Sequence, residues 1–173
     1  MKHGFIRTGF GIAALVAAGC TEDTTVADPR VAALTFNEMA GTGGDFAEVI
    51  NTGSADVDVS GYGATDSNDD GSPRAASVVR FPAGTVVRAG GYLVVMFESN
   101  CPAGATYPCF RCEAGISQGS GENIHLVNAQ NAAVRTVAYP ANGAPSGRSL
   151  GRIPNGTGPF VSTVRTLGAA NSP

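Results

Sequence analysis

Short stretches in which apolar and polar residues alternate recur along most of the chain, and this pattern predicts β-strands. The clearest is Asp45–Asn51, which places Phe46, Glu48 and Ile50 on one face and the residues between them on the other. A turn rich in glycine precedes it, and Asn-Thr-Gly-Ser closes it. Glu48 is therefore a carboxylate set among apolar neighbours, and the face on which it lies decides its surroundings.

Further strand-like segments are separated by turns rich in Gly, Pro, Asn and Asp. They cover residues 31–37, 56–63, 78–81, 84–87, 92–97, 124–127 and 134–139, with a short strand and a rigid turn within 150–160. Tyr92–Phe97 is the most continuous apolar run of these, so we expect it to be buried on both faces. About eight or nine short strands predict an all-β fold, an antiparallel β-sandwich.

The N-terminus has the pattern of an export signal. Lys2, His3 and Arg7 precede an apolar run over residues 10–19, which is too short to span a membrane comfortably and ends at Cys20. The small residues before Cys20 resemble a bacterial lipobox, although Ala stands where Leu is usual. We predict a signal peptide over residues 1–19 and lipidation of Cys20; an ordinary signal peptide with an incidental Cys is the alternative.

The rest of the chain divides into a spacer and one domain. Residues 20–30 begin with a polar stretch and predict a flexible, lipid-anchored spacer. Residues 31–173 are long enough for one domain with a core, and residues 99–121 form an irregular insertion in it. This organisation predicts a lipoprotein of the bacterial cell envelope, at the outer membrane or the cell surface, that touches the membrane through its lipid only.

The charge balance disfavours one class of partner. Loss of residues 1–19 removes Lys2 and Arg7, so the formal net charge moves from −3 to −5, and no lysine remains. An acidic chain of this kind offers no basic surface to a phosphate backbone. We therefore expect no nucleic-acid binding.

Several segments, in this order and spacing, resemble the lamin tail domain, a module of nuclear lamins that also occurs in exported bacterial proteins. They are Phe-Asn-Glu at residues 36–38 and the segments 45–51, 59–62, 81–85, 89–95, 151–160 and 166–171. The chain departs from the family in having no Trp, in Leu167 where Pro is expected, and in the insertion with its cysteines. The resemblance, over residues 31–171, implies an immunoglobulin-like sandwich. It implies a non-enzymatic binding or scaffolding module for an envelope protein or a surface polymer.

Catalytic patterns are not found in the sequence. His125 is the one histidine left after export, and it alternates with apolar residues on a predicted strand. We expect its ring to face solvent or a cross-strand neighbour. No nucleophile elbow, phosphate loop or zinc-protease motif is present. An envelope enzyme with an unfamiliar site is the alternative, and it would need a deep pocket lined by Glu and Asp.

The acidic segment over residues 66–73 admits two interpretations. Asp66, Asn68 and Asp70 match the opening of a Ca²⁺-binding loop, in which oxygens at alternate positions surround the cation. The twelfth position is Ser77 where a Glu is required, and no helix pattern flanks the segment. We favour an acidic solvated turn without a cofactor. The alternative is a Ca²⁺-dependent adhesion module.

Three cysteines remain after Cys20 is lipidated, and all lie in the insertion. Export places Cys101, Cys109 and Cys112 in oxidising surroundings, so we expect one disulfide and one leftover thiol. Pairing of Cys101 with either of the other two is feasible, and the odd cysteine offers an intermolecular link. The last two have the spacing of a redox pair, but they lie in an expected loop without the strand-to-helix context of such a motif.

Glu48 is the remaining candidate. We hypothesise a structural ion pair with Arg80 or Arg152, because an unpaired buried carboxylate is costly. An ordinary strand Glu in water is the alternative. If its face is the outer one, Phe46 and Ile50 form an apolar patch beside it, which would dock a partner or another part of the chain.

Overall fold

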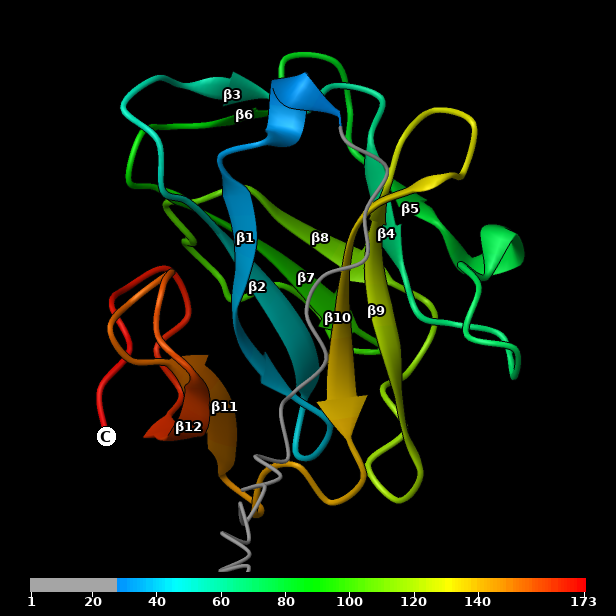
Figure 1. Cartoon of the computed structure of the whole chain (residues 1–173), viewed down its shortest axis with the longest axis vertical. Coiled ribbons are helices and arrows are strands. Elements are labelled where there is room, and N and C mark those ends of the chain that lie inside the picture. Colours follow the sequence, from blue (N-terminus) through cyan, green and yellow to red (C-terminus); the bar gives the residue numbers. More distant parts are fainter. Residues whose placement is uncertain (1–27) are drawn as a thin grey trace, which may run out of the picture.

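Strands make up nearly all of the regular structure in residues 28–173, which are the residues that the computed structural model describes (Figure 1). Two single 3₁₀ turns, η1 (Pro29–Val31) and η2 (Ala75–Ser77), are the only helical elements in this range. The predicted signal peptide, Cys20 and most of the predicted spacer lie outside the described residues. The expectations for them stay predictions.

The larger sheet has six strands in the order β12-β11-β1-β2-β7-β8. They are β1 (Leu34–Ala40), β2 (Asp45–Asn51), β7 (Tyr92–Phe97), β8 (Cys109–Cys112), β11 (Arg148–Arg152) and β12 (Phe160–Val164). All neighbours are antiparallel except β7 and β8, which run parallel. β2 therefore occupies the middle of the sheet, and its two neighbours satisfy its backbone groups.

The second layer is a four-stranded antiparallel sheet in the order β10-β9-β4-β5. Its strands are β4 (Gly63–Thr65), β5 (Val79–Arg80), β9 (Gly121–Val127) and β10 (Ala133–Pro140). A small ribbon of β3 (Val57–Asp58) and β6 (Val86–Val87) closes one end, at the top of Figure 1. The prediction of an immunoglobulin-like β-sandwich is confirmed, with one parallel pair added.

The main core lies between the two sheets. It takes alternate residues of the central strands and of the facing hairpin, among them Phe36, Met39, Val49, Leu93, Val95, Phe97, Ile124, Leu126 and Val137. Every residue of β7 after Tyr92 is buried, which confirms the expectation that this strand is covered on both faces.

A second, smaller core covers the outer face of the six-stranded sheet. It is built from Ala40, Phe46, Val94 and Met96, with Cys101, Tyr107, Cys109 and Leu167 packed against them. The covering residues come from the insertion and from the C-terminal end of the chain. The patch beside Glu48 therefore docks another part of the same chain, as one of the sequence alternatives anticipated.

Several predicted elements need correction, and one of them, the segment 56–63, divides between β3 and β4, which belong to different sheets. β1 begins at Leu34, because Val31 belongs to η1, where the Asp28 side chain accepts a hydrogen bond from the Arg30 N–H. Residues 109–112 form an edge strand and not part of an irregular loop: the Glu98 N–H donates to the Cys112 carbonyl and the Val94 N–H to the Pro108 carbonyl. The insertion thus extends the sheet, because its backbone pairs with the free side of β7.

Candidate functional site

Two glutamates lie directly opposite each other on the central strands of the large sheet. Glu38 on β1 is the cross-strand partner of Glu48 on β2, and both side chains are fully buried. The register of β1 shifts between Phe36 and Glu38, so Asn37 is an extra residue at a β-bulge. The bulge turns Glu38 from the core face, where Phe36 lies, to the outer face beside Glu48.

The partners of Glu48 are neutral groups. Asn37 Nδ2 donates to its Oε1 at 2.9 Å, and the Gly168 N–H donates to its Oε2 at 2.6 Å. Both alternatives from the sequence, an ion pair with an arginine and a solvated carboxylate, are wrong. Arg80 donates to the Asn128 carbonyl at 2.7 Å, and Arg152 Nε to the Phe36 carbonyl at 2.8 Å.

Glu38 is held by the same stretch of chain. Its carboxylate accepts hydrogen bonds from the Thr166 N–H at 3.1 Å and from Thr166 Oγ1 at 2.9 Å. On the other side, Ser149 Oγ on β11 donates to Oε1 at 2.5 Å. Both glutamates therefore fasten residues 165–171, which we call the C-terminal segment.

The ends of the C-terminal segment are fixed independently. Arg165 Nη1 donates to the Gly43 carbonyl at 2.7 Å, in the turn between β1 and β2, and its guanidinium lies 5.6 Å from the centre of the Phe46 ring. Asn171 Nδ2 donates to the Asn37 carbonyl at 2.9 Å. The segment is thereby held at both ends and, through the glutamates, in its middle.

Burial dominates the electrostatics of the pair. It raises the pKa of Glu48 from 4.5 to about 8, and the Glu38 charge acts in the same direction, while the bonds from Asn37 and Gly168 oppose the shift. Burial also raises the pKa of Glu38, opposed first by the Ser149 hydroxyl and then by Thr166. Since donors of the protein occupy both carboxyls, the arrangement orders the C-terminal segment and is structural in kind.

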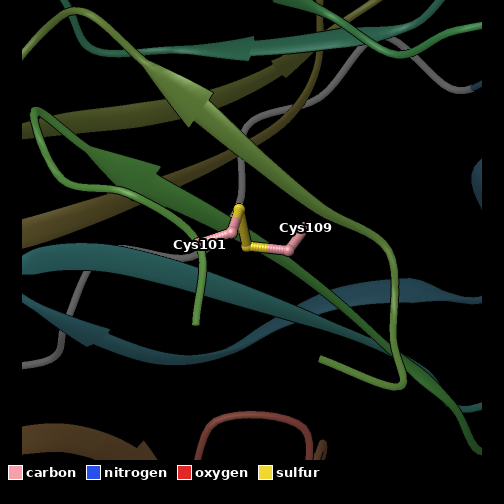
Figure 2. The surroundings of a disulfide bond; sticks show 2 residues. All are labelled: Cys101 and Cys109. Carbon is pink, nitrogen blue, oxygen red and sulfur yellow. A yellow bond between two sulfur atoms is a disulfide. The ribbon is translucent and has the colours of Figure 1, made fainter. Parts of the chain in front are cut away.

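The cysteines are arranged as one disulfide and one thiol. Figure 2 shows the bridge from Cys101, in the loop after β7, to Cys109 at the start of β8. Cys112 is free and buried, with its sulfur 3.2 Å from the Ser77 carbonyl. The expected stoichiometry is confirmed, and the structure selects the first of the two pairings. Cys109 packs in the outer core and Cys112 in the main core, on opposite faces of β8.

The acidic segment is closed by its own side chains. Asp66 is buried, and its Oδ2 lies 3.1 Å from Arg74 Nε. Asp70 Oδ1 accepts from the N–H and hydroxyl of Ser72, at 2.9 and 2.6 Å, which is the geometry of an Asx turn. No group of three His, Cys, Asp or Glu side chains suited to a metal occurs within residues 28–173. The turn interpretation fits Asn68 and Asp70, whereas Asp66 is paired and not solvated.

His125 lies under this acidic segment in β9. Its ring is buried, and Nδ1 lies 2.9 Å from Thr136 Oγ1 on β10. Of the two expected orientations, the cross-strand one is correct. Burial lowers the pKa of the imidazole, which favours its neutral form.

Sequence reasoning did not single out Glu38, Thr166 and Gly168 as a connected group. Glu38 and residues 166–171 both lie in segments that support the family resemblance, yet they are separated by more than a hundred residues. A strict alternation would also have placed Glu38 on the core face. The bulge at Asn37 gives no strong signal in a single sequence.

Comparison with known proteins agrees with this architecture. The family model described as Lamin Tail Domain matches residues 27–141, more than half of the chain. No curated protein gives a significant match. Within the described part of the chain, no helix is long and apolar enough to cross a membrane. This match, together with the immunoglobulin-like sandwich to which the matched residues contribute β1 to β10, shows that the chain belongs to the lamin tail domain family.

Proposed function

We propose that this protein is an exported lipoprotein, tethered through Cys20, that displays a non-enzymatic lamin tail domain at the bacterial cell envelope. The domain contacts an envelope protein or a surface polymer there. Its family is one of immunoglobulin-like structural and interaction modules. The lipobox-like residues before Cys20 supply the tether, and the sandwich supplies the rigid contact surface.

The observation that carries the proposal is the use of the two buried glutamates. Paired carboxylates on one face of a sheet could also serve as the acid and base of a catalytic site. Here the C-terminal segment covers Glu38 and Glu48 and donates to both of them. They therefore stabilise the outer face of the sheet, which supports a structural module.

The start of the domain limits how far it can stand from the membrane. Asp28 is held by the Tyr62 hydroxyl at 2.6 Å and by Arg30 at 2.9 Å, so the chain is fixed to the domain at this residue. A fully extended chain from Cys20 to Asp28 spans at most about 28 Å. The domain would thus stay close to the lipid surface and meet partners there.

Lipidation of Cys20 and membrane association of the chain in cells test the proposal. We expect the wild-type chain to incorporate labelled palmitate and to sediment with membranes, and Cys20→Ser to lose both properties. Thr21→Ala, which keeps the cysteine, is the matched control and behaves as wild type. Protease treatment of whole cells then reports whether the domain faces outward. Unchanged membrane association of Cys20→Ser would contradict the proposal.

A further inference from the structure

An open groove of about 710 Å³ lies beside the outer core and extends to Gly168, whose N–H donates to Glu48. Residues 84–86 and Arg88, around β6, form one wall, and residues 105–108 of the insertion with Phe110 of β8 form the other. Gly91 and Tyr92, at the start of β7, and Gly168 of the C-terminal segment complete the lining. Its volume is in the range of sites that hold small organic ligands.

Aromatic rings line this groove in fixed positions. Phe110 is stacked on Phe81 with ring centres 4.8 Å apart. Tyr107 packs against Gly168 so closely that a Cβ on the glycine would lie 2.1 Å from the ring. The Tyr92 hydroxyl accepts a hydrogen bond from Asn155 Nδ2 at 2.9 Å. Rings held in this way are ready to contact a ligand without further loss of side-chain freedom.

Arg88, on the first wall, is the unusual charged residue of the groove. Within residues 28–173 every other arginine donates to an acceptor of the protein. The Arg88 carbonyl accepts from the Gly91 N–H at 2.8 Å, but its side chain is exposed and in that same range has no hydrogen bond, ion pair or ring contact. The Tyr107 hydroxyl on the opposite wall also lacks a protein partner in this range. Arg88 and Tyr107, whose polar groups have no protein partner in this range, thus both line a groove with aromatic walls.

A guanidinium without a protein partner beside aromatic rings indicates the chemical class of the ligand. A guanidinium matches a carboxylate, with which it forms two parallel charge-assisted hydrogen bonds. Aromatic faces with a few polar groups suit the flat apolar faces of sugar rings. Strand addition of a peptide would need a row of free backbone groups. Here turns, glycines and Pro108, which has no N–H, supply much of the lining.

We propose that this groove binds a uronate-bearing oligosaccharide, with Arg88 on a sugar carboxylate and Tyr92, Tyr107 and Phe110 against the rings. The inference rests on the proposed function and specifies its surface polymer. Since the chain is acidic overall, with a formal net charge of −3, the attraction has to come from this local cation and not from a general basic surface. Binding therefore depends sharply on one residue.

The test uses the full-length chain in detergent and isothermal titration with tetragalacturonate. The fully methyl-esterified tetramer is the uncharged probe, and tetraglutamate is the peptide probe. We expect tetragalacturonate to bind and both other probes to fail. Arg88→Gln should weaken binding about tenfold or more, since it removes a charge-assisted pair.

The matched control is Arg111→Gln, which removes an exposed arginine on β8 that pairs with Glu113 and lies outside the groove lining. It should bind as wild type, while Tyr107→Phe should weaken binding by about threefold through loss of one hydrogen bond. Unchanged unfolding midpoints confirm that the variants fold. Equal binding of the ester, wild-type affinity in Arg88→Gln, preference for tetraglutamate, or no binding at all would each overturn the inference. None of these results bears on lipidation, which the Cys20→Ser experiment tests separately.

Discussion

At the scale of single residues, the burial of Glu38 and Glu48 makes the largest unfavourable contribution to folding that we identify in this domain. A carboxylate without partners in such surroundings would destabilise the fold by several kcal/mol. The cost is offset because Asn37, Gly168, Ser149 and Thr166 all donate to the pair. Burial still dominates, so the pKa of each carboxyl is raised.

The raised pKa of Glu48, about 8 against an ordinary 4.5, gives a pH dependence of stability with a definite sign. A group whose pKa is higher in the folded state contributes most below its unfolded pKa, and this contribution is lost as pH rises through the folded pKa. The wild type should therefore lose stability, relative to Glu48→Gln, between about pH 4.5 and about pH 8.

Denaturant unfolding of both proteins at pH 5 and pH 9 measures this difference. At pH 5 the variant should be less stable by about 1–3 kcal/mol, because its amide NH₂ faces an N–H donor. By pH 9 this difference in free energy of unfolding between wild type and variant should shrink or reverse, by an amount on the order of a few kcal/mol. Glu113→Gln, at an exposed carboxylate, is the control for simple charge removal. A gap that stays constant from pH 5 to pH 9 would refute the assignment.

The cysteines give a second prediction at this scale. Peptide mapping of the non-reduced protein should find Cys101 joined to Cys109. Cys112 should resist alkylation in the native protein and react once the protein is unfolded in denaturant, because its sulfur is buried in the main core. Rapid native labelling of Cys112, or its presence in a disulfide, would contradict the structure.

The C-terminal segment is the element that most affects the outer face of the sheet, although it contains no helix or strand. Its residues supply donors to both glutamates, and Leu167 covers the outer core. Gly168 is the tightest point, with a positive φ of 74° and the Tyr107 ring against it. No other residue fits there without strain.

Gly168→Ala should therefore lower the free energy of unfolding by more than the backbone strain of a positive φ alone would do. The matched control is Gly61→Ala, where φ is 77° and a Cβ meets nothing within 4 Å. We expect about 1 kcal/mol for the control and about 3 kcal/mol or more for Gly168→Ala, which adds a steric clash. Chemical denaturation of both variants measures the difference. Equal losses would mean that the segment is not packed as described.

At the scale of the whole molecule, local patterns predicted the class of fold and most of the strands. Alternation was sufficient for β2, and a continuous apolar run was sufficient for β7, because both patterns depend directly on which faces of the sheet are covered. It was insufficient for β8, whose pairing with β7 depends on backbone groups, and for the bulge at Asn37. The link from Thr166 to Glu38 spans 128 residues, a separation that no local pattern encodes.

The residues of the candidate site were likewise predicted from the sequence only in part. The sequence identified Glu48 as unusual, the three cysteines as a disulfide set and the acidic segment as a turn. It assigned the wrong partner to Glu48, because one donor, Asn37, lies at a bulge of β1 and the other, Gly168, lies in a loop that returns across the sheet. Arg88 gave no signal at all, since an exposed arginine acquires meaning only when the walls of the groove are seen together.

In the proposed arrangement, a spacer after a lipidated Cys20 holds a rigid lamin tail domain within about 28 Å of a membrane. Intact-mass spectrometry of the mature protein, purified from membranes, tests this most directly. The account predicts a chain that begins at Cys20, with the added mass of lipid on that residue. An unmodified chain, or one that begins at any other residue, would contradict it.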